Sequence, residues 1–128
     1  IYVKAALELL RGSGAEVTAL AHITGGGFQN MTRIASSCGY TLDALPTPPA
    51  IFQALAAGGV PTKDLYEAYN MGVGMAVTVR PGGEEAALEA ARSRGWEAWV
   101  IGRATAEAGI RLPGVGLQSS GEGGFQPL

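Results

Sequence analysis

The apolar residues of this chain follow the period of a helix in some segments and that of a strand in others. The first fourteen residues carry apolar side chains at helical spacing and end in two glycines, which predicts a helix that stops there. Residues 17–24 (VTALAHIT) form the apolar run of a strand in a covered sheet. Residues 28–36 (FQNMTRIAS) have the spacing of a short helix, and residues 40–45 (YTLDAL) alternate as a strand.

The alternation of helices and strands continues along the chain. Helices are predicted at residues 50–58 (AIFQALAAG), 63–70 (KDLYEAYN) and 84–95 (EEAALEAARSRG), and strands at residues 71–80 (MGVGMAVTVR) and 96–106 (WEAWVIGRATA). Thr62 stands where an N-cap of the second of these helices is expected. Trp96 and Trp99 are expected to pack at the entrance of the last strand, and residues 110–114 (IRLPG) are expected to add a short edge strand.

Helices interleaved with about four or five strands predict an α/β fold with layered elements. The length of 128 residues suits one domain, which we expect to cover residues 1–112. Residues 113–128 are rich in Gly, Ser and Gln, a composition that is typical of mobile segments. The sequence therefore predicts a flexible tail after the domain.

Composition and charge exclude several classes of protein. Hydrophobic residues make up 47% of the chain and charged residues 16%, which is typical of a globular protein. The net charge of −2 provides no basic surface, so no nucleic-acid partner is expected. Cys38 is the single cysteine, which excludes an internal disulfide and fits the reducing cytoplasm. No apolar run reaches the roughly 18 residues of a membrane span, and no signal peptide is visible. Because Ile1 already lies in a helical pattern, we expect a piece of a longer protein.

Residues 24–28 (TGGGF) place three consecutive glycines between a predicted strand and a predicted helix. Glycine loses more backbone entropy on folding than other residues, so the run needs a reason. One interpretation is an anion site, in which the backbone N–H groups of Gly25–Gly27 bind a phosphate at the start of the helix. The further groups within reach of that anion are the Thr24 hydroxyl and the side chains of Asn30 and Arg33. The other interpretation is a loop that only turns the chain. No lysine follows the glycines, which excludes a P-loop.

Two further segments carry candidate chemistry. His22, the only histidine, lies two residues before the loop, where it could transfer a proton or have a structural role. In residues 69–75 (YNMGVGM), glycines at strand positions indicate the close approach of a ligand or of another segment. Asn70 is the polar group beside that opening, next to Gly72. No pair of carboxylates has the spacing of metal ligands, so no metal site is expected.

Three segments together resemble one family. They are AHITGGGFQNMTR, LPTPPAIFQALAAGGVP and LYEAYNMGVGMAV, and their order and spacing are similar to those of the C-terminal domain of the phosphoribosylformylglycinamidine cyclo-ligase family, also called aminoimidazole ribonucleotide synthetase. The resemblance covers roughly residues 1–109. It implies a three-layer α/β/α domain with a mixed sheet of about four to six strands.

The resemblance also implies an activity. Members of this family use ATP to close the imidazole ring of formylglycinamidine ribonucleotide, which gives 5-aminoimidazole ribonucleotide in purine biosynthesis. ATP and Mg²⁺ would be bound mostly by an N-terminal domain outside these residues, and the whole enzyme would be a homodimer. We therefore expect the isolated chain to be inactive.

The family further implies roles for particular residues. His22 would act near the reacting end of the substrate as a proton carrier or as an orienting donor. The residues that would bind the ribonucleotide and its phosphate are Thr24, Gly25, Gly26, Gly27, Asn30, Arg33, Asn70 and Gly72. Two alternatives stay open. The first is another member of the same ATP-using superfamily, similar to selenophosphate synthetase or to a hydrogenase-maturation factor. The second is a non-catalytic domain that keeps a phosphate pocket for binding or assembly.

Overall fold

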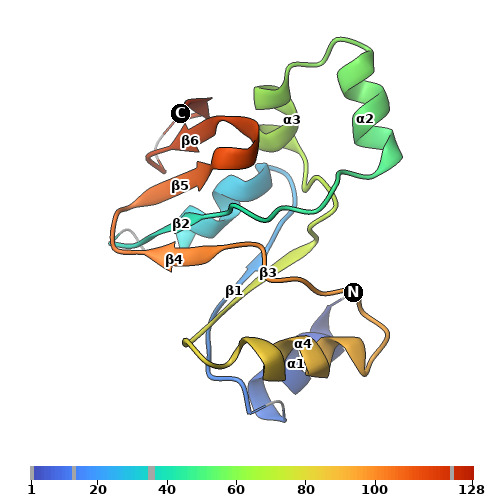
Figure 1. Cartoon of the computed structure of the whole chain (residues 1–128), viewed down its shortest axis with the longest axis vertical. Helices are drawn as coiled ribbons and strands as arrows, with labels where there is room; N and C mark the ends of the chain where they lie inside the picture. Colours follow the sequence, from blue (N-terminus) through green and yellow to red (C-terminus); the bar gives the residue numbers. More distant parts are fainter. Residues whose placement is uncertain (1, 13, 35–36, 122) are drawn as a thin grey trace. The chain divides into compact units, whose positions relative to one another are not determined.

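A computed structural model describes residues 2–12, 14–34, 37–121 and 123–128 of the chain. Helices and strands alternate along these residues in the predicted order, which confirms the α/β class (Figure 1). The chain divides into two compact units. Unit 1 contains the residues up to Leu20 together with Val77–Val100, and unit 2 contains Ala21–Ala76 together with Ile101–Leu128.

Unit 1 pairs two amphipathic helices, α1 (Val3–Arg11) and α4 (Glu84–Arg92), which contact each other. Helix α1 buries Leu9 and ends at Arg11 with Gly12 as its C-cap, as the glycines of this segment predict. Helix α4 carries acidic residues in its first turn and Arg92 in its last turn, an arrangement that the helix dipole favours. An ion pair of 2.6 Å joins Arg94 Nη2 to Glu8 Oε1 and adds little stability because both side chains are partly exposed.

Strands β1 (Val17–His22) and β3 (Met75–Val79) form a two-stranded sheet, and the boundary between the units falls within both strands. At the unit 2 end, the N–H of Ile23 donates to the carbonyl of Gly74 at 3.0 Å. Side chains alternate along this end, because Ala21 and Ile23 are buried whereas His22 is exposed. The alternation places the only histidine on the solvent side of β1.

Unit 2 is built on a five-stranded sheet with the strand order β4-β2-β5-β6-β7 (Figure 1). Its strands are β4 (Arg103–Thr105), β2 (Gly39–Thr41), β5 (Gly109–Leu112), β6 (Leu117–Ser119) and β7 (Gln126–Pro127). Strand β2 runs parallel to β5, and the other neighbouring strands are antiparallel. The predicted mixed sheet is therefore confirmed, with two of the strands set apart in a second sheet.

Helical segments pack on this sheet. The 3-10 helix η1 (Gly27–Arg33) contacts β2 and β5, and helix α3 (Thr62–Ala68) contacts η1. The largest fully buried side chains among the described residues belong to Ile23, Phe28, Ile110, Leu112 and Phe125. All of them join one apolar cluster within unit 2, so η1 lies between the sheet and α3 over a continuous core.

The C-terminal residues differ from the prediction of a flexible tail. They form the 3-10 helix η2 (Pro113–Val115) and strands β6 and β7, and they bury Leu117 and Phe125. The prediction from composition is wrong here. Two buried apolar side chains are sufficient to hold a Gly-rich segment in place when the neighbouring strand has unpaired backbone N–H and C=O groups. Strand β5 is accordingly not an edge strand, since it lies between β2 and β6.

Several boundaries in the first 106 residues also differ from the prediction. The strand expected at 40–45 is reduced to Gly39–Thr41. The expected strand at 96–106 is reduced to Arg103–Thr105. The strand expected from residue 71 begins at Met75, because the residues before it form a turn. Thr62 is the first residue of α3 rather than its N-cap, since Pro61 occupies the cap position with an extended conformation. Within the described residues, none of the helices combines the length and the apolar character that crossing a membrane requires.

The position of β5 at the centre of the sheet leads to a test of the core. Replacing Ile110, which is 1% exposed, by Ala should lower the free energy of unfolding by about 2–5 kcal/mol through lost burial and a cavity. Ile51→Ala is the matched control, because that side chain is 62% exposed and its loss should change stability by about 0.5 kcal/mol or less. Urea unfolding of both variants measures the difference, and equal midpoints would contradict the assigned core.

Candidate functional site

The three consecutive glycines form a tight turn between β1 and η1. The N–H of Gly27 donates to the carbonyl of Thr24 at 2.9 Å, which places Gly25 and Gly26 at the centre of the turn. Gly26 and Gly27 have φ angles of 96° and 53°, in the left-handed region that side chains other than that of glycine rarely tolerate. Backbone conformation therefore explains two of the three glycines.

Gly27 also lies very close to helix α3. A Cβ atom at this position would collide with the carbonyl oxygen of Tyr66 and would lie 3.0 Å from that of Tyr69. The missing side chain lets the turn lie directly against the C-terminal end of α3. The predicted glycine loop and the segment that begins at Tyr69 are thus neighbours in the structure.

Two polar side chains from η1 surround the backbone of Gly26. Asn30 Nδ2 donates to the carbonyls of Gly27 and Gly25 at 2.9 and 3.3 Å, so the side chain of Asn30 holds the turn closed. A Cβ built on Gly26 would lie 3.7 Å from Arg33 Nη2 and 3.7 Å from Asn30 Oδ1. The exposed guanidinium of Arg33 therefore lies beside Gly26, and it makes no ion pair with any carboxylate of the described residues.

The glycine amides are unequally available. The N–H of Gly27 is used within the turn. Across the described ranges of the chain, no hydrogen bond occupies the N–H of Gly25 or that of Gly26. An anion at this turn could thus receive hydrogen bonds from two amides and from the Arg33 guanidinium, rather than from the three amides that the sequence suggested.

The segment around Asn70 is a second turn. Asn70 Oδ1 accepts a hydrogen bond of 3.0 Å from the N–H of Gly72, and the carbonyl of Asn70 accepts one of 2.9 Å from Val73. Met71 and Gly72 both have positive φ angles, of 51° and 96°. A Cβ on Gly72 would lie 2.7 Å from Pro49 Cδ. Another segment of the chain, the proline-rich bend at residues 46–49, therefore makes the close approach that Gly72 predicted.

The structure brings most of the predicted site residues into one region of unit 2. Gly26, Asn30 and Arg33 lie together, and Gly27 links them to the end of α3, which leads directly into Asn70. His22 and Thr24 are both exposed at the end of β1, two residues apart, as strand alternation predicts. Sequence reasoning missed the carbonyl groups of α3 on which the loop rests, because a backbone contact of that kind leaves no side-chain pattern.

Tyr66 supports the loop from beneath. Its ring stacks on Phe28 with centroids 5.8 Å apart, and the ring is 5% exposed. Burial raises the pKa of Tyr66 above its usual value of 10.0, because the phenolate would lose its hydration. The candidate site therefore rests on an apolar base that includes one titratable group.

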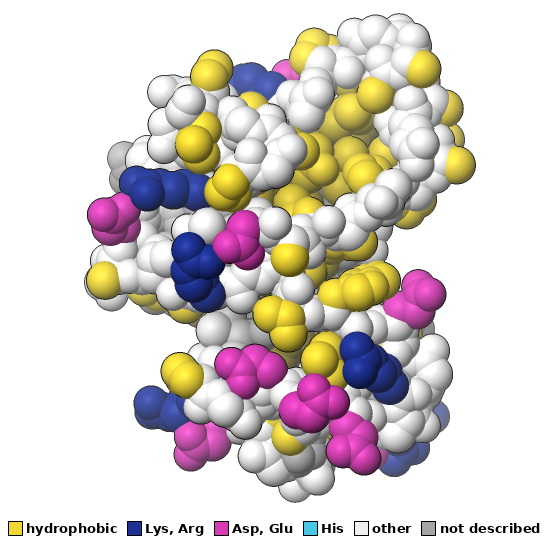
Figure 2. All heavy atoms as spheres, viewed as in Figure 1, with side chains coloured by type: hydrophobic (Ala, Val, Ile, Leu, Met, Phe, Trp, Pro, Cys, Tyr) yellow, Lys and Arg dark blue, Asp and Glu magenta, His cyan; other side chains and the backbone are white. Residues whose placement is uncertain are grey.

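Apolar side chains gather beside this region, around helix α2 (Ala50–Ala57) (Figure 2). The ring of Tyr69 lies 5.6 Å from that of Phe52 and is 43% exposed, and Ile51 is more exposed still. Phe52 and Leu55 only partly bury their side chains against the core. The polar turn is thus flanked by aromatic surface within the same unit.

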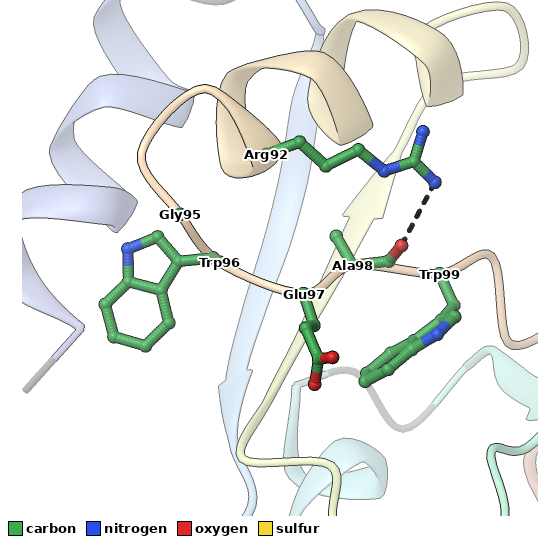
Figure 3. A pocket seen from close by; sticks show the side chains of 6 residues that line it. All are labelled: Arg92, Gly95, Trp96, Glu97, Ala98 and Trp99. Atoms are coloured by element: carbon green, nitrogen blue, oxygen red, sulfur yellow. Dashed lines mark hydrogen bonds between the residues drawn. The ribbon is translucent and has the colours of Figure 1, made fainter.

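A hollow of about 370 Å³ lies in unit 1 and contains none of the predicted site residues. It is lined by Arg92, Gly95, Trp96, Glu97, Ala98 and Trp99 (Figure 3). Arg92 Nη2 donates to the carbonyl of Ala98 at 3.2 Å, and Glu97 lies between the two indole side chains. The prediction that the tryptophans pack is confirmed for Trp96, whose ring lies 5.1 Å from that of Tyr2 between centroids. The two residues are still 37% and 49% exposed, and the segment around them is not a strand. Within the described part of the chain, no three His, Cys, Asp or Glu residues gather as a metal site.

Comparison with known proteins identifies sequences similar to this one. The profile of the family described as "AIR synthase related protein, C-terminal domain" matches residues 1–114. A phosphoribosylformylglycinamidine cyclo-ligase from Methanothermobacter thermautotrophicus is 44% identical over 88 residues, which are 69% of this chain and 26% of that protein. The enzyme of the same name from Thermococcus gammatolerans is 40% identical over 118 residues, 92% of this chain and 34% of the relative.

A bacterial relative gives a similar result. The phosphoribosylformylglycinamidine cyclo-ligase of Exiguobacterium sibiricum is 41% identical over 118 residues, which are 88% of this chain and 33% of that protein. The chain therefore spans between about a quarter and a third of the length of these curated relatives.

Two neighbouring glycines allow the geometry of the turn to be tested. Gly27→Ala should lower the free energy of unfolding by about 2–4 kcal/mol, because the new Cβ meets the Tyr66 carbonyl and φ is positive. Gly25→Ala is the control, since a Cβ there meets no atom within 4 Å and the backbone of Gly25 is not left-handed. Chemical denaturation of both proteins checks this, and equal losses would show that Gly27 is not seated against α3.

The buried tyrosine leads to a pH dependence. Its folded-state pKa is raised, so above pH 10.0 the unfolded chain releases this proton while the folded protein retains it. The free energy of unfolding should therefore fall as pH rises from about 10 through the folded-state pKa. In Tyr66→Phe this contribution is absent. The free energy of unfolding of the unmodified protein, minus that of Tyr66→Phe, should stay constant below pH 10.0 and fall above it. Denaturant titrations at several pH values test this, and parallel curves throughout would refute it.

Proposed function

Because the chain belongs to the family of AIR synthase related C-terminal domains, we propose that it is the substrate-binding part of an ATP-dependent cyclo-ligase. The reaction proposed for the parent protein is the conversion of formylglycinamidine ribonucleotide to 5-aminoimidazole ribonucleotide in purine biosynthesis. Relatives that carry the name phosphoribosylformylglycinamidine cyclo-ligase support this reaction.

One observation carries the assignment of the binding site, namely the position of Arg33 beside Gly26. A ribonucleotide carries a 5′-phosphate, and two free amides next to a guanidinium are suited to a phosphate. The guanidinium presents planar N–H groups that match phosphate oxygens, and no described carboxylate competes for it. We assign the phosphate to the turn formed by Thr24–Gly27, with the Thr24 hydroxyl as a further donor.

The remaining predicted residues take roles along the rest of the substrate. Asn70 and Gly72 follow the end of α3, against which the turn rests, so they would line the cleft that holds the ribose and the reacting groups. His22 is exposed two residues before the turn. In the proposed reaction it accepts the proton that the attacking amidine nitrogen releases, or it orients that nitrogen by a hydrogen bond.

ATP and Mg²⁺ are assigned to the part of the parent protein outside this chain. When bound, ATP supplies the phosphoryl group that converts the formyl oxygen into a leaving group. The described residues bring together no cluster of metal ligands, and no step is assigned to a metal on this chain. An N-terminal domain that binds ATP and a homodimeric parent enzyme complete the proposal, with the family resemblance as their support.

The phosphate assignment is tested by removing one positive charge. Arg33→Ala should weaken the binding of ribose 5-phosphate by about 10- to 100-fold, because a charge-assisted hydrogen bond is lost. Arg103→Ala removes the same charge from β4 of the same unit, where Arg103 pairs with Asp43 at the surface, and should leave the affinity unchanged. Calorimetry with ribose 5-phosphate, 5-aminoimidazole ribonucleotide and inorganic phosphate measures both.

Three outcomes separate the alternatives. Loss of binding in Arg33→Ala alone supports the assigned phosphate site. Equal binding by both variants and the unmodified chain contradicts it. Binding of every phosphorylated sugar with the same affinity as 5-aminoimidazole ribonucleotide, together with a parent protein that does not turn over, would support a non-catalytic phosphate-binding domain.

A further inference from the structure

The last twelve residues of the chain are part of unit 2, although the family profile ends at residue 114. Strand β6 pairs with β5 in the register Ile110 to Ser119 and Leu112 to Leu117, and β7 pairs with β6. The N–H of Leu128 donates to the carbonyl of Gly116 at 2.9 Å, which closes the segment on itself. Residues 117–121 and 123–128 are called the C-terminal strap below.

Glu67, in the last turn of α3, binds the strap through its carboxylate. Glu67 Oε1 accepts a hydrogen bond from the backbone N–H of Phe125. The same carboxylate pairs with Lys63 Nζ at 3.2 Å, one turn earlier on the helix. A Cβ on Gly124 would collide with Glu67 Oε1, so the strap passes directly against the carboxylate. A side chain of α3 thus binds backbone that lies 58 residues further along the chain.

The strap also contacts η1. The ring of Phe125 is fully buried in the cluster that contains Phe28 and Tyr66, whose rings stack on each other. A Cβ on Gly121 would lie 3.5 Å from Thr32 Cβ, so the strap passes along η1 as well. Because η1 carries Asn30 and Arg33, and α3 carries the carbonyls that seat Gly27, the strap contacts both elements that shape the glycine turn.

We propose that Glu67 is a positioning residue for the glycine turn and acts through the strap. Its hydrogen bond to Phe125 keeps that ring inserted beneath η1 and α3. The inserted ring holds η1 against α3, which fixes the distance between the Gly26 backbone and the Arg33 guanidinium. Loss of the acceptor at Glu67 releases the strap locally, and the turn then binds anions less tightly. This inference rests on the proposed function only for the identity of the anion.

Three substitutions separate the hydrogen bond from the ion pair. Glu67→Ala removes the acceptor, Glu67→Gln keeps an acceptor oxygen without the charge, and Lys63→Met removes the ion pair alone. Hydrogen exchange followed by NMR reports the opening of individual amides without any ligand. In Glu67→Ala we expect exchange of the Phe125 amide and of the η1 amides to rise together by about tenfold or more, in line with the loss of a charged hydrogen bond. Glu67→Gln should recover most of the protection, and Lys63→Met should behave as the unmodified chain.

The binding of ribose 5-phosphate supplies the second readout. Its dissociation constant should rise in Glu67→Ala, by about 3- to 10-fold, and be largely restored in Glu67→Gln. Faster exchange at Phe125 with unchanged exchange in η1 would overturn the proposal. Equal acceleration in the β2–β4 pair would also overturn it, because the effect would then be a general loss of stability.

Two further tests apply if a variant does not fold or if the unmodified chain does not bind the sugar phosphate. If Glu67→Ala does not fold, Phe125→Leu shortens the inserted side chain while keeping it apolar, and the exchange of η1 should rise with that of the strap. If the unmodified chain does not bind ribose 5-phosphate, the phosphate assignment fails. The positioning role is then decided by hydrogen exchange alone.

Discussion

The backbone of Gly27 lies directly on the carbonyl groups at the end of α3, and much of the candidate site depends on this contact. No other residue could occupy the position, because a Cβ would meet the carbonyl oxygen of Tyr66. The close approach sets the turn between β1 and η1, and it brings Arg33 and Asn30 to the backbone of Gly26. It also joins the turn to the segment that contains Asn70. The arrangement that is suited to a phosphate is thus a consequence of packing between two backbones, which the apolar contact of Phe28 with Tyr66 stabilises from below.

The sequence contains enough information to predict the main elements of the fold and the position of the glycine turn. The periodicity of apolar residues predicts the order of helices and strands, and strand alternation predicts that His22 and Thr24 share one side. The structure adds that both residues are exposed, which a strand in a covered sheet did not suggest. The glycine run identifies the turn because left-handed backbone and close approach both require glycine. The individual roles of His22, Arg33 and Asn70 stay predictions, since they depend on the substrate.

Other features could not be read from local patterns. The stretch from Trp96 has the composition of a strand, yet strand formation needs a partner, and only Arg103–Thr105 pairs with β2. The segment after Pro113 has the composition of a flexible tail, yet its strand β6 pairs with β5 and its Phe125 side chain is buried in the core. In both cases a contact between residues far apart in the chain overrides the local propensity. For the same reason the sequence does not indicate a role for the Glu67 carboxylate. Its partner is a backbone amide, which has no sequence signature.

Met71 shows how the turn after α3 keeps its shape. Left-handed backbone at a residue with a side chain costs about 1–2 kcal/mol, and burying a methionine side chain contributes about 1.5–3 kcal/mol. Because Met71 combines a φ of 51° with a side chain that is only 4% exposed, its burial is sufficient to offset the unfavourable conformation. The buried side chain of Met71 therefore stabilises the conformation of this turn. The orientation of Asn70 is fixed with it, because its side-chain oxygen accepts a hydrogen bond from the N–H of Gly72 in the same turn.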